Sequence, residues 1–305
     1  MIGIDWGTSS LRAYLLDPDG RVLERRVSSE GILSAAGRFG AVLDGLISGW
    51  PAEPVLMSGM IGSRQGWAEA PYVACPAGAG ALAAQLRRVT TAGPRGVHIV
   101  PGLAMLDGEG IPDVMRGEET QVLGALAALG RSSGRIVLPG THSKWVSVAD
   151  GCITGFSTYM TGEVFAALKG HTILGRTMDG EEIDEGGFAR GVEQARGDCG
   201  PPGRLLHRIF STRTLGLFER LAPREAAGYL SGLLVGAEIV AATPLPDEGG
   251  SSAGVGSGIV VVANSALAAL YADAAGRLGL SAEVAPADCV TAGHGVIARA
   301  ARLVA

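Results

Sequence analysis

The residues most suggestive of chemistry stand near the start of the chain, where Asp5 closes an apolar run and precedes a Gly-Thr-Ser-Ser turn at residues 7–10. The run predicts a buried strand, and the turn leads into a second strand over residues 11–16. The amide and hydroxyl groups of such a turn can surround a phosphate, while the carboxylate can hold the divalent cation that accompanies a nucleotide. An ordinary hairpin with a solvated Asp5 is the alternative interpretation of this stretch.

The same pattern returns in the middle of the chain. Residues 135–153 again predict an apolar strand, a Gly-Thr-x-Ser turn, a second strand, an Asp-Gly turn and a third strand. A repeated supersecondary unit predicts two similar domains in one chain. The second copy has Leu138 in the position of Asp5, and it gains Lys144. One metal-binding carboxylate and one added cation suit two hairpins that hold opposite sides of one polyphosphate.

Length and composition restrict the class of protein. The 305 residues suffice for two domains, each with its own core, and the Gly/Ser-rich stretch 130–134 predicts domains at 1–132 and 133–305. A net charge of −5 argues against nucleic acid or an anionic membrane as the main partner. The four cysteines are widely separated, no secretion leader precedes the first strand, and no apolar run approaches membrane-spanning length. We therefore expect a cytoplasmic protein.

The first domain is expected to alternate strands and helices after an initial meander. The apolar spacings predict strands at residues 21–27, 54–57 and 97–100 and helices at 39–47, 79–88 and 117–129. The resulting βββαβαβα order predicts a mixed sheet with helices on its faces.

The second domain is expected to begin again with three strands, after which Thr161 would cap a helix. Later patterns predict a helix at 223–242, a buried strand at 259–263, a helix that Asn264 and Ser265 cap and that runs to about 278, and a terminal helix from about 291. A buried strand that turns through small residues into a helix is a favoured place for a nucleotide. Residues 178–213 suggest only a charged, solvated helix face, and residues 245–258 predict a flexible loop.

A glycine-rich loop at residues 58–67 carries Arg64, Gln65 and Trp67. Such side chains among glycines suit a small polar ligand. A surface loop with incidental charge is an equally good interpretation.

Two halves of this kind, each led by a Gly-Thr hairpin, resemble the superfamily of sugar kinases, heat-shock chaperone ATPases and actins. The resemblance implies an α/β fold of two ribonuclease H-like domains with mixed sheets, and an active site in the cleft between them. It also implies that the hairpins are phosphate loops and that helices at 117–129 and 292–303 cross between the domains.

Several segments narrow the resemblance to the 2-dehydro-3-deoxygalactonokinase family, namely residues 4–12, 58–67, 115–121, 138–145 and 159–163. This resemblance implies phosphorylation of a six-carbon 2-keto-3-deoxy sugar acid on its 6-hydroxyl, with ATP and Mg²⁺. The product would be 2-dehydro-3-deoxy-6-phosphogalactonate, an intermediate of galactonate catabolism. One departure is Ala263-Asn264-Ser265, where relatives in the wider superfamily often carry a glycine pair beside the adenosine.

Residues and resemblance together predict the following binding residues. Mg²⁺ is assigned to Asp5. The nucleotide is assigned to Gly7, Thr8, Ser9, Ser10, Gly140, Thr141, Lys144, Asn264 and Ser265. The sugar acid, whose carboxylate calls for a guanidinium, is assigned to Ser58, Arg64, Gln65, Trp67, Tyr72 and Arg116.

Glu118 is the predicted general base, because related sugar kinases carry a Gly-Asp pair where this chain has Gly117 and Glu118. Glu119 is the second candidate and Glu163 the third. The alternative is that Glu118 and Glu119 only complement the helix dipole.

Two rival functions are weighed against the sugar-acid kinase. The first is a kinase of the same fold acting on another keto sugar, polyol or sugar acid. The second is a nucleotide-driven chaperone or filament protein, which is disfavoured because no appended domain is expected after the last crossover helix. The expected partners are therefore a small sugar acid and a nucleotide, without nucleic acid or membrane, and a homodimer is left open.

Overall fold

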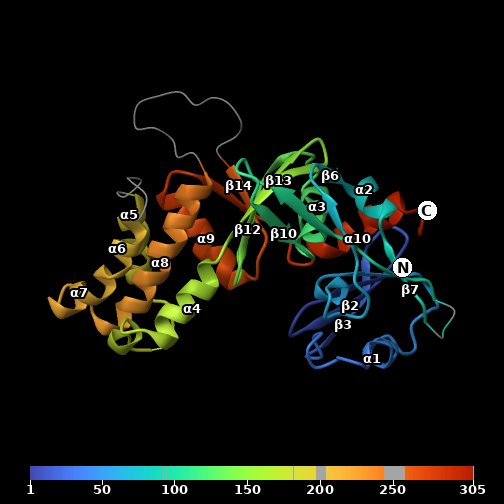
Figure 1. Cartoon of the computed structure of the whole chain (residues 1–305), viewed down its shortest axis with the longest axis horizontal. Helices are drawn as coiled ribbons and strands as arrows, with labels where there is room; N and C mark the ends of the chain where they lie inside the picture. The colour runs from blue at the N-terminus through green and yellow to red at the C-terminus, as the bar shows by residue number, and fades with distance from the viewer. Residues whose placement is uncertain (92, 94, 181, 197–203, 244–257, 305) are drawn as a thin grey trace. The chain divides into compact units, whose positions relative to one another are not determined.

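The structure is a computed structural model, and it describes residues 1–304 except 92, 94, 181, 197–203 and 244–257 (Figure 1). Its contacts divide the chain into two compact units. Unit 1 comprises Met1–Ile136, Val146–Phe156 and Ala285–Ala305, and unit 2 comprises Val137–Trp145 and Ser157–Val284. The predicted domain boundary between residues 132 and 133 lies shortly before Ile136, where the chain first leaves unit 1. The domain limits stay a prediction.

The first sheet contains the opening hairpin. Its strands are β1 (Ile2–Trp6), β2 (Leu11–Leu16), β3 (Val22–Ser28), β4 (Val55–Ser58), β7 (Arg87–Val89) and β8 (Val97–Ile99), in the order β3-β2-β1-β4-β8-β7. The meander β1–β2–β3 is antiparallel, and β4 and β8 continue it in parallel. Ile2, Ile4 and Trp6 are fully buried, so β1 is the central strand that the apolar run predicted.

The sheet that contains the second Gly-Thr hairpin repeats the order of five of these strands, and its sixth strand lies at the opposite edge. Its strands are β6 (Ala77–Gly78), β11 (Gly134–Leu138), β12 (Ser143–Ala149), β13 (Cys152–Tyr159), β14 (Gly258–Val261) and β15 (Ser281–Val284), in the order β15-β14-β11-β12-β13-β6. In both sheets the first strand of the meander has two neighbours, namely its second strand and a strand from later in the chain. Strand β1 lies between β2 and β4, and β11 lies between β12 and β14. The predicted repeat and the mixed α/β fold are therefore confirmed.

The described helices of unit 2 pack against one buried helix. They are α4 (Thr161–His171), α5 (Glu185–Arg196), α7 (Ser211–Leu217) and α9 (Ser265–Arg277), which pack against α8 (Pro223–Ala242), and the short α6 (Arg204–Ile209) also contacts it. Helix α8 has the length and mean hydropathy of a membrane span, but 67% of that stretch is buried inside the structure. The prediction that no apolar run approaches membrane-spanning length was therefore wrong by length and composition. Such burial is typical of a core helix.

Unit 1 contains two helices that cross at very close range, α3 (Glu118–Ala128) and α10 (Cys289–Ala300). A Cβ atom at Gly124 would lie 1.9 Å from the carbonyl oxygen of Cys289, so only glycine permits this approach. The remaining elements of unit 1 are α1 (Phe39–Leu46), α2 (Ala79–Ala84) and a small sheet of β5 (Tyr72–Ala74), β9 (Gly102–Leu106) and β10 (Pro112–Met115).

Some predicted elements were wrong. The helix predicted at 79–88 ends at Ala84, because residues 87–89 pair with β8 as β7. The βββαβαβα order omitted the short strands β5, β6, β9 and β10. Thr161 is the first residue of α4 rather than its cap, which is Met160. The charged face predicted near residues 184–196 is confirmed on α5, whereas the loop at 245–258 lies almost wholly outside the described residues.

Candidate active site

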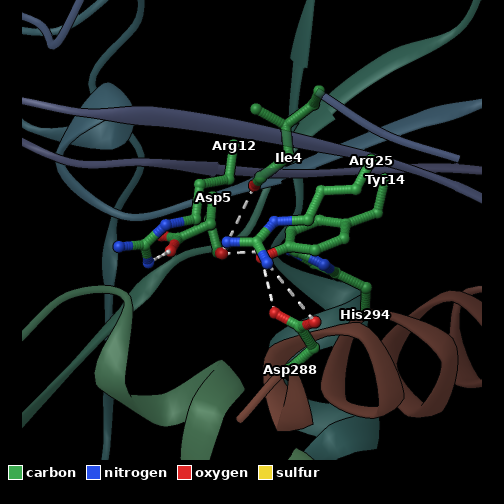
Figure 2. Close-up of polar contacts among 8 residues, drawn as sticks. Ile4, Asp5, Arg12, Tyr14, Arg25, Asp288 and His294 are labelled. Carbon is green, nitrogen blue, oxygen red and sulfur yellow. Dashed lines mark hydrogen bonds and ion pairs between the residues drawn. The ribbon is translucent and has the colours of Figure 1, made fainter. Parts of the chain in front are cut away.

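Asp5 and Arg12 form an ion pair on the first hairpin. The antiparallel register places them opposite each other, and Arg12 Nη1 donates to Asp5 Oδ2 at 3.3 Å (Figure 2). The Asp5 side chain is 15% exposed, and burial raises the pKa of its carboxyl even though Arg12 opposes that effect. A bound divalent cation would stabilise this desolvated carboxylate, so Asp5 fits the predicted magnesium ligand.

Backbone hydrogen bonds within the turn at residues 7–10 and from the segment at residues 31 and 32 stabilise its conformation. The N–H of Gly7 donates to the carbonyl of Ser10 at 2.9 Å, and the N–H of Ile32 donates to the carbonyl of Gly7 at 3.1 Å. A Cβ atom at Gly31 would lie 2.2 Å from the carbonyl oxygen of Thr8, so the supporting segment approaches closely. Thr8 and Ser9 remain exposed at the tip, where a phosphate could reach their amides and hydroxyls.

A second polar cluster joins the hairpin to the start of α10. The Tyr14 hydroxyl donates to Asp288 Oδ1 at 3.2 Å, and Arg25 Nη1 lies 3.8 Å from Asp288 Oδ2 (Figure 2). Burial and the Asp288 charge raise the pKa of Tyr14. Sequence reasoning missed this cluster, because no local motif connects residues 274 positions apart.

Ser58 lies in the core rather than at an open surface. It is 0% exposed, and its hydroxyl lies 3.0 Å from Nε2 of His294, which is also 0% exposed. Gly3 makes room for the imidazole, since a Cβ atom there would lie 2.7 Å from His294 Nδ1. Burial lowers the pKa of His294 to about 4, so the ring is neutral at pH 7. This structure does not bring Ser58 to a surface that a substrate could reach.

Arg116 is enclosed beneath the glycine-rich loop. It is 8% exposed, its Nη2 donates to the carbonyl of Ala70 at 2.8 Å, and its guanidinium lies 4.4 Å above the ring of Tyr72. Its Nε and Nη1 atoms are buried and lack hydrogen-bond partners among the described residues. Unsatisfied buried donors are costly, which is one reason to expect that Arg116 gains an anionic partner.

The other predicted substrate residues lie on the same loop, except Tyr72, which begins β5. The Arg64 side chain is 88% exposed and lies 3.7 Å from Glu69, and Gln65 is exposed as well. Trp67 is half-buried and stacks on Phe39 at a ring-centroid distance of 6.4 Å. Tyr72 is 46% exposed. Unit 1 therefore presents an exposed guanidinium and an aromatic ring on this loop, and a second ring, that of Tyr72, on β5.

Two carboxylates occupy the first turn of α3. Glu118 is half-buried, and its Oε2 accepts the N–H of Arg116 at 3.0 Å. Glu119 is 0% exposed, and it accepts the N–H of Gly117 at 2.6 Å and the hydroxyl of Thr120 at 2.9 Å. Burial and the neighbouring Glu118 charge raise the pKa of Glu119 to about 7. A general base must reach its substrate, so the more accessible Glu118 is the better candidate.

In unit 2 the tip of the second hairpin rests on the first turn of α4. The N–H of Glu163 donates to the carbonyl of Thr141 at 3.0 Å, and His142 Nε2 lies 2.5 Å from Glu163 Oε2. A Cβ atom at Gly162 would lie 2.4 Å from the carbonyl oxygen of Gly140. Thr141 and His142 are exposed at the tip, in positions equivalent to Thr8 and Ser9.

Lys144 follows the tip on β12 and is 7% exposed, with its ammonium donating to the Thr158 hydroxyl at 2.6 Å. At the start of α9, Asn264 accepts the N–H of Leu267 at 3.1 Å, which confirms the predicted cap, and Ser265 is exposed beside it. Each predicted nucleotide-binding residue of unit 2 thus lies at a turn or at the first residues of an element.

Sequence reasoning also missed a buried network around Glu238 of α8. Its two oxygens accept the indole N–H of Trp145 at 2.7 Å and the hydroxyl of Tyr271 at 2.9 Å. A single carboxylate in an otherwise apolar helical run was the one signal that the sequence offered. Among the residues that the structure describes, no three His, Cys, Asp or Glu side chains gather as a metal site.

Comparisons with known proteins agree with one another. Residues 5–297 match the model of the 2-keto-3-deoxy-galactonokinase family. A Rhizobium meliloti protein named as a probable 2-dehydro-3-deoxygalactonokinase is 40% identical over 304 residues, which cover 97% of this chain and 96% of that protein. The 2-dehydro-3-deoxygalactonokinase of Escherichia coli is 38% identical over 241 residues, which cover 78% of each chain.

A solved structure supports the same relationship. The crystal structure of a Sinorhizobium meliloti protein described as a 2-dehydro-3-deoxygalactonokinase matches with a TM-score of 0.85 and 38% identity. The match covers 99% of this chain and 98% of that one, so the shared fold extends over both units.

Proposed function

The chain belongs to the 2-keto-3-deoxy-galactonokinase family, and on that premise we propose that it transfers the γ-phosphate of ATP to the 6-hydroxyl of 2-dehydro-3-deoxy-D-galactonate. The products are 2-dehydro-3-deoxy-6-phosphogalactonate and ADP. The observation that carries the proposal is the family match over residues 5–297, which contains every residue assigned to the site. A kinase of the same fold acting on another keto sugar, polyol or sugar acid is the alternative.

Phosphate binding is assigned to the two Gly-Thr turns. Gly7, Thr8, Ser9 and Ser10 offer amides and hydroxyls on a turn that the neighbouring chain supports from beneath. Gly140 and Thr141 do the same on the second hairpin, and Lys144 follows them. Phosphoryl transfer depends mainly on positioning and charge stabilisation, and such rigid turns suit that requirement.

Asp5 would hold Mg²⁺, which when bound neutralises charge on the phosphates and orients them. The buried position of Asp5 and its raised pKa support this role, because an added cation would compensate the desolvated charge. The Arg12 guanidinium could then leave Asp5 and contact the phosphates or solvent, since its side chain is 44% exposed.

Glu118 is proposed as the base that accepts the proton of the 6-hydroxyl. The hydroxyl oxygen forms a bond to the γ-phosphorus, the bond from that phosphorus to the bridging oxygen of ADP breaks, and the proton passes to the Glu118 carboxylate. The N–H of Arg116 donates to one oxygen of this carboxylate at 3.0 Å, which orients the Glu118 side chain at the start of α3.

Recognition of the sugar-acid carboxylate is assigned to the loop that carries Arg64, Gln65 and Trp67, together with Tyr72 and Arg116. Arg64 is exposed and can move toward a ligand, whereas Arg116 has unpaired donors that lie beneath the loop. The aromatic rings of Trp67 and Tyr72 would wall the carbon chain.

The nucleotide base is assigned to the start of α9, where Asn264 and Ser265 follow a buried strand. We also place the protein in the cytoplasm, where ATP is available and thiols stay reduced. Among the described residues, Cys75, Cys152 and Cys289 carry free thiols. A homodimer is left to direct measurement.

The test of the proposed function is ADP release, measured in a coupled assay with the purified chain. The substrates are 2-dehydro-3-deoxy-D-galactonate and a panel of other sugar acids, keto sugars and polyols at equal concentration. Fastest turnover of 2-dehydro-3-deoxy-D-galactonate supports the proposal, and faster turnover of a polyol or neutral keto sugar would favour the alternative.

A further inference from the structure

Glu238 stands alone as a charged residue in the apolar stretch of α8 from 226 to 242. The structure places it at 3% exposure in the core of unit 2. A carboxylate buried to this degree is costly unless hydrogen bonds compensate it. The position therefore requires an explanation beyond packing, because an apolar side chain would fill the same space without that cost.

The compensation comes from several donors. Trp145 Nε1 donates to Oε1 at 2.7 Å, the Tyr271 hydroxyl donates to Oε2 at 2.9 Å, and the Thr161 side chain also interacts with the carboxylate. Because the Tyr271 proton lies on Glu238, the Ser143 hydroxyl, 3.0 Å from that of Tyr271, donates to the Tyr271 oxygen and joins the network through it. An indole N–H can only donate, so the position of Trp145 is tied to one oxygen of Glu238.

These donors lie on the elements that were assigned to the nucleotide for other reasons. Ser143 and Trp145 flank Lys144 on β12, directly after the second Gly-Thr turn. Because side chains alternate along a strand, Ser143 and Trp145 face Glu238 while Lys144 faces the other way, toward Thr158.

The other two donors, Thr161 and Tyr271, lie on helices α4 and α9. Thr161 opens α4 beside Gly162, which packs on the tip of the second hairpin. Tyr271 lies less than two turns into α9, which Asn264 and Ser265 begin. One carboxylate thus joins the hairpin strand, the helix beneath the hairpin tip and the helix assigned to the nucleotide base.

We propose that Glu238 is a positioning residue for nucleotide binding, which holds the second phosphate hairpin, the start of α4 and α9 in the arrangement that ATP requires. This inference rests on the proposed function, because it takes the nucleotide-binding role of these elements from there. Glu238 itself contacts neither nucleotide nor sugar acid.

The experiment compares variants of the full chain by two measurements, calorimetric binding of MgADP and the KM values for ATP and for the sugar acid. The variants are Glu238→Ala, Glu238→Gln and Tyr271→Phe. Tyr229→Phe is the matched control, because Tyr229 is 2% exposed in the same unit and its hydroxyl bonds to Ser211 at 2.8 Å, away from the network. Both tyrosine variants delete one buried hydroxyl, so a general loss of stability affects both.

We expect Glu238→Ala to weaken MgADP binding about tenfold or more and Tyr271→Phe to weaken it several-fold, with the sugar-acid KM within about twofold of wild type. Glu238→Gln should recover most of the affinity, because its amide oxygen can still accept from Trp145 while its N–H₂ donates to a hydroxyl that turns around. Tyr229→Phe should leave MgADP binding within about twofold, even where its melting temperature falls.

The proposal is overturned if Tyr271→Phe and Glu238→Ala weaken MgADP binding no more than Tyr229→Phe does, or if the sugar-acid KM rises instead. Should Glu238→Ala fail to fold, the two tyrosine variants decide. Failure of the proposed function is seen separately. If the wild-type chain binds MgADP but does not phosphorylate the sugar acid, the proposed substrate is wrong. The role of Glu238 in nucleotide binding is then still tested by the MgADP affinities of the same variants.

Discussion

Asp5 of β1 and Arg12 of β2 are direct cross-strand partners, and their side chains meet at 3.3 Å. The pairing follows from the turn at residues 7–10, which sets the register of the hairpin. Arg12 is the more exposed partner, at 44% against 15% for Asp5. The carboxylate is thus fixed by the sheet, whereas the guanidinium has room to leave it when a stronger cation arrives.

Asp5→Asn is expected to abolish Mg²⁺-dependent turnover, because a neutral amide is a poor magnesium ligand. Binding of the sugar acid without nucleotide should survive, since that ligand is assigned to a separate loop. Steady-state assays across Mg²⁺ concentrations and calorimetry with the sugar acid alone measure the two effects. Asp17→Asn, in the turn at the other end of the same hairpin, is the matched control and should keep its activity. Full turnover by Asp5→Asn at ordinary Mg²⁺ would remove Asp5 from the metal site.

Glu118→Gln is expected to lower kcat by roughly 10²–10⁴, the usual contribution of a general base, while MgADP affinity stays nearly unchanged. Glu119→Gln should have a much smaller effect, because Glu119 is fully buried and its oxygens are bonded to Gly117 and Thr120. Both variants are compared by kcat at saturating substrates. The reverse order of effects would move the base to Glu119.

Glu119 should also make the stability of the chain depend on pH. Its pKa is raised to about 7 in the native state from an ordinary value of 4.5. Between those values the native state keeps a proton that the unfolded state releases, so stability falls as pH rises from about 4.5 to about 7 and then levels off. The loss is on the order of 3 kcal/mol.

Glu119→Gln, which mimics the protonated carboxyl, should therefore gain stability relative to wild type as pH rises from 5 to 8. Urea unfolding at several pH values measures the difference. Glu109→Gln is the control, because Glu109 is exposed, and it should show no such trend. A stability difference for Glu119→Gln that stays constant with pH would contradict the raised pKa.

The sequence predicted those parts of the site that local patterns encode. The two Gly-Thr turns, the strands around them and the Asn264 cap each depend on a few neighbouring residues, and the structure contains them. The shared strand order of the two sheets follows from the same repeat. Short strands such as β6 were missed because two residues carry no periodicity.

Contacts between distant positions could not be predicted in this way. Ser58 was assigned to the substrate from its place in a glycine-rich loop, but it bonds to His294, 236 residues later. Glu238 bonds to Trp145 at a separation of 93 residues. The enclosure of Arg116 likewise depends on Ala70 and Tyr72, which only the folded chain brings together.

The carboxylate of the sugar acid should dominate substrate choice. A charge-assisted pair that loses its partner costs about 1.5–3 kcal/mol, roughly ten- to hundredfold in kcat/KM, whereas a single hydroxyl contributes less unless its loss strands a buried donor. We expect 2-dehydro-3-deoxy-D-galactonate to be the best substrate, its C4 epimer to be weaker, and neutral hexoses to be essentially inactive.

Arg64→Met should raise the sugar-acid KM about tenfold or more without lowering the melting temperature, because Arg64 is 88% exposed. Arg116→Met should raise the sugar-acid KM and also lower the melting temperature, since it also removes the hydrogen bond to the carbonyl of Ala70. Glucose or glycerol turning over as fast as the sugar acids would exclude a guanidinium–carboxylate contact and the proposed substrate together.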